Sequence, residues 1–309
     1  MSILKTTALT KKFGDFTALD GVDIEVAKGE VYGFIGPNGA GKSTTIRVLL
    51  GLLKVTSGTA EIFGQDVWED AVDIHKRVAY VPGDVNLWPN LTGGEVIDLF
   101  LKLRGSNGKT RREELIRKFD LDPTKKCRTY SKGNRQKVAL VAALSTDADL
   151  YILDEPTSGL DPLMERVFQE WVREAKAQGK SILLSSHILS EVEKLCDKVA
   201  IIRQGKIIET GTLQELRHLT GTVLTVETKR PMPSLHEVGG IQGIQEKQGV
   251  LSFQVDAEEL DQVIRYISGF GVVKLESSPP TLEELFMRHY EGGSSADKQE
   301  AAYHGQKLV

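Results

Sequence analysis

The sequence has only two cysteines in 309 residues and no long apolar run. Cys127 and Cys196 stand far apart and without CxxC spacing, so we expect two reduced, buried thiols and neither a disulfide nor a metal site. No apolar stretch approaches the roughly 20 residues that cross a bilayer. The first residues lack the apolar core of a signal peptide, so we expect a cytoplasmic protein.

An excess of basic residues is also missing. The chain has 39 Lys and Arg against 43 Asp and Glu, a net charge of -4. General nucleic-acid binding needs clustered positive charge, so we expect no nucleic-acid partner. The length is sufficient for one large domain and a smaller one.

The first part of the chain alternates strand and helix patterns. Residues 16–35 are rich in strand-forming residues, and we expect breaks at Gly21 and Gly29. The apolar run from Val31 to Ile35 is typical of a buried strand. A helix, "KSTTIRVLLGLL", follows a glycine-rich loop and is expected to end near Gly51. Strand, loop and helix in this order indicate an α/β fold.

A helical insert is predicted at about residues 84–147. "LTGGEVIDLFLKLRG" begins with a capping box of Thr92 and Glu95 and ends at Gly105. "RREELIRKFDLD" is a second amphipathic helix, and Ser131 is placed to cap a third. The α/β alternation then resumes with "LYILDEP", "LMERVFQEWVREAKAQG", "SILLSSH" and "ILSEVEKLC", followed by a hairpin that turns at Gln204 and Gly205.

The pattern of the sequence changes near residue 219. Short strand patterns with one or two helices predict a small α+β domain at 220–291, separate from the larger domain at 1–219. Residues 292–309 have no apolar period, so we expect a flexible tail.

The stretch "GPNGAGKSTT" is a phosphate-binding loop. It matches G-x-x-x-x-G-K-[ST] between an apolar strand and a helix, the context that this motif requires. Backbone N–H groups of such a loop and the start of the helix bind phosphates. Lys42 is expected to reach the β- and γ-phosphates, and Ser43 to bind Mg²⁺. The residues expected to contact the nucleotide here are Gly36, Asn38, Gly39, Ala40, Gly41, Lys42, Ser43 and Thr44.

Two carboxylates follow the strand of "LYILDEP". Asp154 is predicted to hold Mg²⁺ with Ser43, and Glu155 to polarise the attacking water. Phosphoryl transfer depends mainly on positioning and charge neutralisation, so adjacent carboxylates with different roles suit it. The alternative is an acidic turn after a strand.

Four motifs in order, "GPNGAGKST", "YSKGNRQK", "YILDEPTSGLDP" and "LLSSH", resemble the nucleotide-binding subunit of ATP-binding-cassette transporters over about residues 3–217. The resemblance implies a P-loop NTPase core with an antiparallel β subdomain and a helical subdomain. It also implies ATP and Mg²⁺ as ligands, a dimer of the ATPase chain, and a separate integral membrane permease that holds the chain on the inner face of the cell membrane.

Individual roles follow from the same resemblance. Phe13 matches the aromatic residue that stacks on adenine, although a core position is the plain alternative. Residues 158–161, "SGLD", match the loop that meets the second subunit. His187 matches the histidine that contacts the γ-phosphate and is expected, with Glu155, to be catalytic.

The sequence departs from the family at its signature, usually Leu-Ser-Gly-Gly-Gln. Here Ser131 keeps the hydroxyl, Gly133 keeps a backbone that can approach closely, and Asn134 keeps a side-chain amide. The resemblance implies that these three residues contact ATP held by the opposite subunit. Lys132 replaces a glycine and either crowds the phosphate or adds positive charge beside it. A weakened closure surface is the alternative.

A second departure lies after "VAYVP", where the family usually has glutamine. Gly83 stands there, followed by Asp84, and either Asp84 takes over the role by a shift of the loop or the role is absent.

The α+β extension and the ending "PPTLEELFMRHYE" are similar to the branch of drug and antibiotic exporters. Rival hypotheses are a soluble cassette ATPase acting on DNA or the ribosome, and a regulatory module that binds ATP without useful turnover. The sequence does not identify the transported compound. It also leaves open whether the dimer is a homodimer or a heterodimer.

Overall fold

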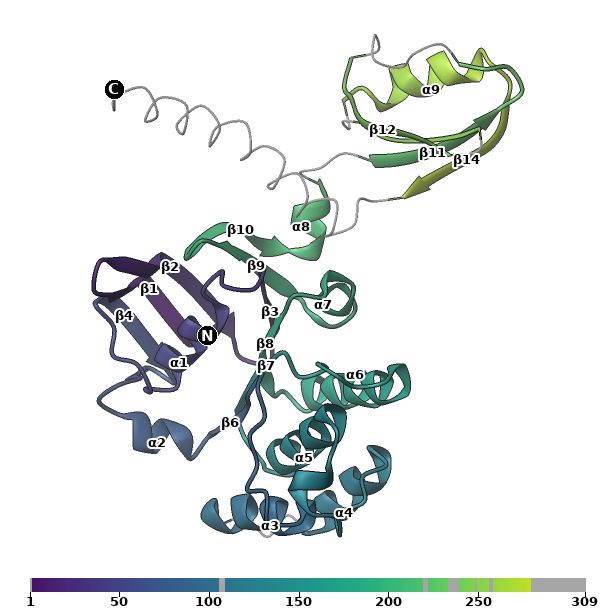
Figure 1. The fold of residues 1–309 in the computed structure, drawn as a ribbon. Coiled ribbons are helices and arrows are strands. Elements are labelled where there is room, and N and C mark those ends of the chain that lie inside the picture. The colour runs from purple at the N-terminus through teal and green to yellow at the C-terminus, as the bar shows by residue number, and fades with distance from the viewer. Residues whose placement is uncertain are drawn as a thin grey trace, which may run out of the picture. The chain divides into compact units, whose positions relative to one another are not determined.

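The computed structural model describes residues 2–105, 109–218, 222–232, 239–247, 249–255 and 258–278. The chain divides into two compact units, Met1–Thr212 and Leu213–Val309, which Figure 1 shows from purple to yellow along the chain. The division falls before the boundary at 219 expected from the sequence, because the short helix α8 (Leu213–His218) groups with the second unit. The expected tail at 292–309 lies outside the described residues.

An antiparallel sheet, in the order β2-β1-β4-β5, opens the first unit. Its strands are β1 (Ser2–Phe13), β2 (Phe16–Ala27), β4 (Ser57–Ile62) and β5 (Gln65–Asp66). The expected break at Gly21 is wrong. Gly21 lies inside β2 with a φ of 69°, a backbone conformation that glycine adopts without the strain of a side chain.

The central sheet has the order β10-β9-β3-β8-β7-β6. Its strands are β3 (Val31–Ile35), β6 (Val78–Val81), β7 (Leu150–Asp154), β8 (Ser181–Ser186), β9 (Lys198–Arg203) and β10 (Lys206–Thr212). All pairs are parallel except β9–β10, which turns at Gln204 and Gly205 as predicted. Every residue of β3, β7 and β8 is buried, as expected for parallel strands covered on both faces.

Helices cover both faces of the central sheet. Figure 1 shows α1 on the side of the antiparallel sheet and α6 and α7 on the other side. One apolar cluster joins residues of the antiparallel sheet, α1 and the central sheet, so these layers share a core. The helices are α1 (Lys42–Leu49), α2 (Ala71–His75), α6 (Pro162–Ala177) and α7 (Leu189–Leu195).

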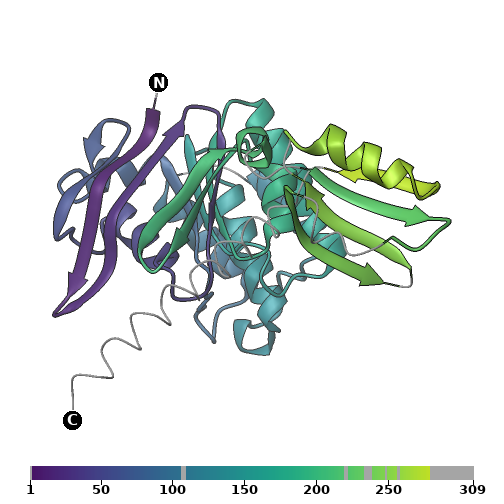
Figure 2. The same cartoon turned by 90° about the horizontal axis from the view of Figure 1, so that it is seen from above.

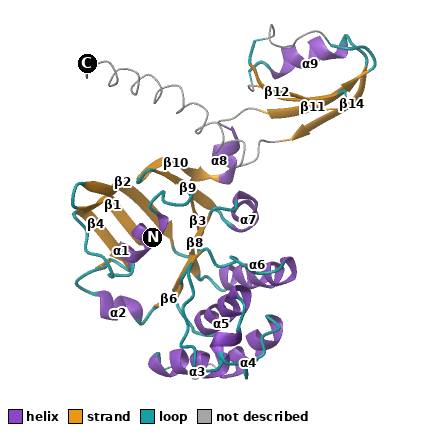
Figure 3. Ribbon diagram, in the orientation of Figure 1, coloured by secondary structure: helices purple, strands orange, loops and turns teal. Residues whose placement is uncertain are grey.

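The helical insert lies beside β6, as Figure 3 shows. It contains α3 (Gly93–Leu103), α4 (Lys109–Lys118), a 3₁₀ turn (Cys127–Thr129) and α5 (Lys132–Leu144). Both predicted caps are present. Thr92 and Glu95 form a reciprocal capping box on α3, and Ser131 caps α5. Each cap satisfies backbone N–H groups that a helix start leaves unpaired.

The second unit is a four-stranded antiparallel sheet in the order β12-β13-β11-β14. Helix α9, yellow-green in Figure 2, packs its buried residues Val263 and Ile267 against this sheet. The elements are β11 (Thr222–Thr228), β12 (Ile241–Lys247), β13 (Val250–Val255), α9 (Leu260–Ser268) and β14 (Val272–Ser278).

The described residues bear on two features of the composition. Cys127 and Cys196 are buried free thiols, as predicted. Among the described helices, none has the length and apolar character required to cross a bilayer.

Candidate nucleotide-binding site

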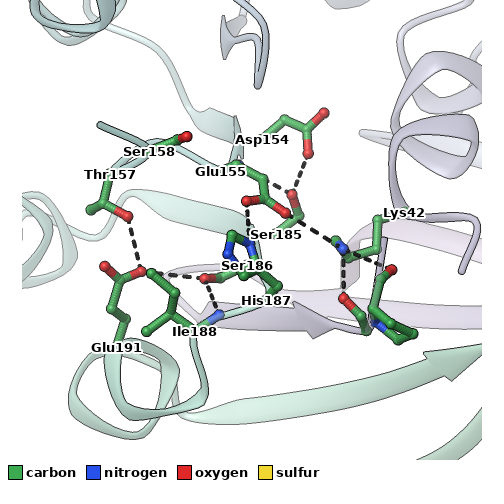
Figure 4. A network of polar contacts seen from close by, with 12 residues as sticks. Lys42, Asp154, Glu155, Thr157, Ser158, Ser185, Ser186, His187, Ile188 and Glu191 are labelled. Atoms are coloured by element: carbon green, nitrogen blue, oxygen red, sulfur yellow. Dashed lines mark hydrogen bonds and ion pairs between the residues drawn. The ribbon is translucent and has the colours of Figure 1, made fainter. Parts of the chain in front are cut away.

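The carboxyl ends of three buried parallel strands form one edge of the central sheet. β3 leads into the phosphate loop, β7 ends at Asp154, and β8 ends at Ser186, beside His187. Asp154 and Ser185 are register partners on β7 and β8. Ligands of open α/β sheets bind at this edge, and Figure 4 shows polar side chains from all three segments there.

The phosphate loop presents backbone because side chains do not fit behind it. A Cβ added at Gly41 would lie 2.8 Å from Leu19 Cδ2, and one added at Gly36 would lie 2.9 Å from Ile202 Cγ2. Gly41 also has a φ of 115° where it caps α1. The loop and helix start therefore have the close backbone approach that phosphate binding requires.

The Lys42 side chain is buried against the phosphate loop. It is 5% exposed, and its Nζ donates to Gly36 O at 2.6 Å and to Pro37 O at 3.2 Å. The same Nζ lies 3.5 Å from Glu155 Oε1. Carbonyl oxygens and a carboxylate thus occupy the ammonium donors that a triphosphate would use.

Ser43 and Asp154 meet at the loop. Ser43 Oγ donates to Asp154 Oδ2 at 3.0 Å, and Ser185 Oγ donates to the other carboxylate oxygen. A hydroxyl beside a buried carboxylate is an oxygen pair that fits Mg²⁺, which takes few protein ligands and completes its shell with phosphates and water. Within the described residues, no group of three or more His, Cys, Asp and Glu side chains is placed to hold a metal ion.

The neighbouring Tyr80 adds no negative charge to this edge. Burial raises the pKa of Tyr80 to about 12, and the Asp154 carboxylate contributes to the rise. The phenol therefore stays neutral at physiological pH.

Glu155 connects the phosphate loop with His187. One carboxylate oxygen faces Lys42 Nζ, and the other hydrogen-bonds His187 Nδ1. Figure 4 shows the Glu155 carboxylate between the two side chains. Glu155 has a φ of 48°, a strained backbone conformation for a non-glycine residue that is often found at functional sites.

The start of α5 contacts the loop at 158–161 of its own chain. Ser131 Oγ accepts from Asn134 N at 3.3 Å, and a Cβ at Gly133 would clash with Gly159 O. Lys132 Nζ donates to Ser158 Oγ at 2.8 Å. Lys132 is thus held by the neighbouring loop, an arrangement that neither alternative for Lys132 anticipated. No hydrogen bond or ion pair joins these residues to the phosphate loop within the described chain.

Phe13 lies at the end of the β1–β2 hairpin. Phe13 is 48% exposed, and Lys11 Nζ lies 5.0 Å from the centroid of its ring. This exposure rules out a core position for Phe13, and adenine stacking stays a prediction.

The segment at Gly83 passes beside the Asp154 carboxylate, which is predicted to hold Mg²⁺. A Cβ at Gly83 would lie 3.4 Å from Asp154 Cγ. The Asp84 side chain is exposed and accepts from Asn86 Nδ2 at 3.4 Å. The backbone therefore reaches the site, whereas replacement of the missing glutamine by Asp84 stays a hypothesis.

Three buried side chains at this edge were not identified from the sequence. Gln136 Nε2 donates to Pro156 O at 3.0 Å, Ser185 supports Asp154, and Glu191 lies on α7. The sequence carried a signal for Ser185, because "SILLSSH" ends a buried apolar run with two adjacent serines, Ser185 and Ser186.

Comparisons with known proteins agree with this geometry. The family model for the ABC transporter matches residues 19–158. A second model, the C-terminal domain of DrrA1-3-like ATP-binding proteins, matches residues 211–290. A strand–loop–helix phosphate site with a paired Asp and Glu defines the class as a P-loop ATPase.

The chain belongs to the ABC transporter family as an ATP-hydrolysing, ATP-binding subunit. It is 32% identical over 287 residues to the ABC transporter ATP-binding protein YhaQ of Bacillus subtilis (strain 168), covering 90% of this chain and 95% of that protein. It is 32% identical over 308 residues to the bacitracin transport ATP-binding protein BcrA of Bacillus licheniformis, covering 95% and 99%. The daunorubicin/doxorubicin resistance ATP-binding protein DrrA of Streptomyces peucetius is 37% identical over 224 residues, covering 71% and 68%.

Solved structures show the same fold. An ATP-binding subunit of an ABC transporter superposes with a TM-score of 0.67 at 35% identity, over 70% of this chain and 92% of that one. A dimeric ATP-binding cassette with ADP and phosphate superposes with a TM-score of 0.63 at 24% identity, over 68% and 98%. The predicted family, fold class and resemblance to drug and antibiotic exporter subunits are confirmed.

Proposed function

We propose that this chain powers the export of an antibiotic or drug-like compound through a separate membrane permease. Support comes from the bacitracin and daunorubicin/doxorubicin relatives and from the DrrA-like match of the second unit. In this proposal the chain is peripheral on the inner face of the membrane, and the permease alone contacts the compound.

The observation that carries the proposed mechanism is the position of Glu155 between Lys42 and His187. An arriving triphosphate offers Lys42 stronger partners than the two loop carbonyls and one carboxylate. Transfer of the ammonium to the phosphates leaves Glu155 paired with His187. Glu155 is then able to orient a water and accept its proton during attack on the γ-phosphate.

Mg²⁺, held by Ser43 and Asp154, would neutralise charge on the phosphate oxygens when bound. The chain supplies the rest of the electrostatic stabilisation. Loop N–H groups and the start of α1 would bind the phosphates, and Phe13 would stack on the adenine. His187 keeps the Glu155 carboxylate oriented.

Two copies of the chain would share each ATP. The start of α5 carries Ser131, Gly133 and Asn134. Within the described chain, no hydrogen bond or ion pair joins these residues to the phosphate loop of the same copy. A helix start carries partial positive charge and suits the γ-phosphate of an ATP bound by a second copy. ATP then favours the closed dimer over the open one, and hydrolysis reverses this preference.

A hollow of about 490 Å³ between α2, β6 and α3 is the proposed contact for the permease. Its rim has large apolar side chains that are strongly exposed, including Leu52, Val72 and Leu103. Clustered exposed apolar residues mark an interaction surface. A short amphipathic segment of the permease would bury them.

The test combines membranes and turnover. The purified chain, incubated with membranes of its source cell, is expected to retain a polytopic membrane protein, and Leu103→Asp is expected to lose it. Steady-state ATP hydrolysis of Leu103→Asp should match the unsubstituted chain. Failure of the unsubstituted chain to retain any membrane protein would contradict the transport proposal.

A further inference from the structure

Glu191 is a buried carboxylate that the mechanism above does not use. It lies on α7 and is 6% exposed. Its Oε2 accepts from Thr157 Oγ1 at 3.0 Å and from Ser186 Oγ at 3.3 Å, and Figure 4 shows Glu191 at the left of the view, with Thr157 above it and Ser186 to its right. One carboxylate oxygen therefore joins two separate segments of the chain.

Each of the two segments has a functional neighbour. Thr157 begins the turn that leads into the loop at 158–161, and its backbone oxygen accepts from Leu160 N at 3.0 Å. Ser186 directly precedes His187, and its Oγ accepts from Ile188 N at 2.9 Å. Glu191 thus connects the loop at 158–161, which is expected to meet a second copy, with the turn that carries His187.

Stability alone does not account for a carboxylate at this position. Its second oxygen, Oε1, has no hydrogen-bond partner within the described residues. Burial raises the pKa of Glu191, and the nearby Glu165 raises it further, whereas Thr157, Ser186 and His187 lower it. Burying an incompletely paired carboxyl group costs free energy that an apolar side chain of similar size avoids.

We propose that Glu191 is a positioning residue for ATP hydrolysis. It holds the loop at 158–161 at a fixed position relative to His187. A movement of the loop on dimer closure is then transmitted to His187 and onward to Glu155. The inference rests on the proposed dimeric mechanism and adds to it a residue that contacts neither nucleotide nor metal.

The expected effect is on turnover and not on ATP binding, because Glu191 contacts none of the nucleotide-binding side chains. Glu191→Ala should lower kcat by about tenfold or more, since misplacement by about 1 Å near reacting atoms can cost about 100-fold. The KM for ATP and the affinity for a fluorescent ATP analogue should stay within about twofold of the unsubstituted chain.

Two further variants separate positioning from folding. Glu191→Gln should retain kcat within about fivefold, because an amide oxygen accepts the same two hydrogen bonds. Thr157→Val should lower kcat, and its combination with Glu191→Ala should cost less than the product of the two single effects, as expected for groups that act together. Glu170→Ala, an exposed glutamate on α6, is the matched control and should change neither constant.

The outcomes are distinct. The inference is overturned if Glu191→Ala leaves kcat unchanged, if it abolishes binding of the ATP analogue, or if Glu191→Gln is as impaired as Glu191→Ala. A chain that hydrolyses no ATP before any substitution would overturn the proposed function and this inference together. Normal hydrolysis that Glu155→Gln abolishes and Glu191→Ala leaves intact would overturn the inference alone.

Discussion

The start of α5 lies so close to the loop at 158–161 that Gly133 has no room for a side chain beside Gly159. This close approach predicts the effect of Gly133→Ala. Alanine suits a helix better than glycine does, by about 1 kcal/mol, so helix propensity alone predicts a more stable protein. The structure predicts the opposite. A Cβ at Gly133 would lie inside the 3.0 Å limit from Gly159 O that real Cβ atoms essentially never cross.

The neighbour in this clash is backbone and not the end of a flexible side chain, so the helix start or the loop must move by about 1 Å. Overpacking of this kind typically costs about 1–3 kcal/mol. Both moving parts belong to the surface proposed to meet the second copy. A displacement of about 1 Å there is expected to lower ATP turnover by about 10- to 100-fold.

The assay is phosphate release at saturating Mg·ATP, with urea unfolding in parallel. Gly239→Ala is the control, because a Cβ there has no atom within 4 Å and its φ is not positive. Gly133→Ala with unchanged turnover and a higher free energy of unfolding would refute the reasoning from this contact.

Three further predictions follow from the site and its supports. Glu155→Gln should lower turnover by about 100-fold or more while ATP binding persists, because an amide accepts no proton from water; phosphate release near the unsubstituted rate would contradict the assignment. Thr92→Ala should lower the free energy of unfolding by about 1 kcal/mol, because the capping box with Glu95 is lost; superimposable urea curves would count against it. Lys132→Ala should change that free energy by less than about 1 kcal/mol, since its bond to Ser158 is exposed; a larger loss would show that this contact supports the fold.

Much of the fold could be predicted because local patterns and tertiary structure agree. The apolar run of β3, the capping box at Thr92 and the turn at Gln204 and Gly205 each specify their own conformation through neighbours in sequence. Gly21 shows the limit of this reasoning. Its neighbours along β2 pair with β1 on both sides, and this long-range pairing overrides the local tendency of glycine to end a strand.

The residues of the site also fall into those that a local motif predicts and those that only tertiary packing brings together. Lys42, Ser43, Asp154 and Glu155 follow from motifs whose chemistry requires those residue types at that spacing. The contact of Lys132 with Ser158 and the bond of Glu191 to Thr157 join segments that are 26 and 34 residues apart. Such pairings depend on how α5, α7 and the loop at 158–161 pack, which no local pattern encodes.

The most direct test of the account is the solution mass of Glu155→Gln, because the central claim is that ATP joins two copies of this chain. Size-exclusion chromatography with light scattering should give a dimer in saturating Mg·ATP and a monomer in Mg·ADP, and adding Gly133→Ala should weaken the ATP-bound dimer. A monomer of Glu155→Gln under saturating Mg·ATP would contradict the claim.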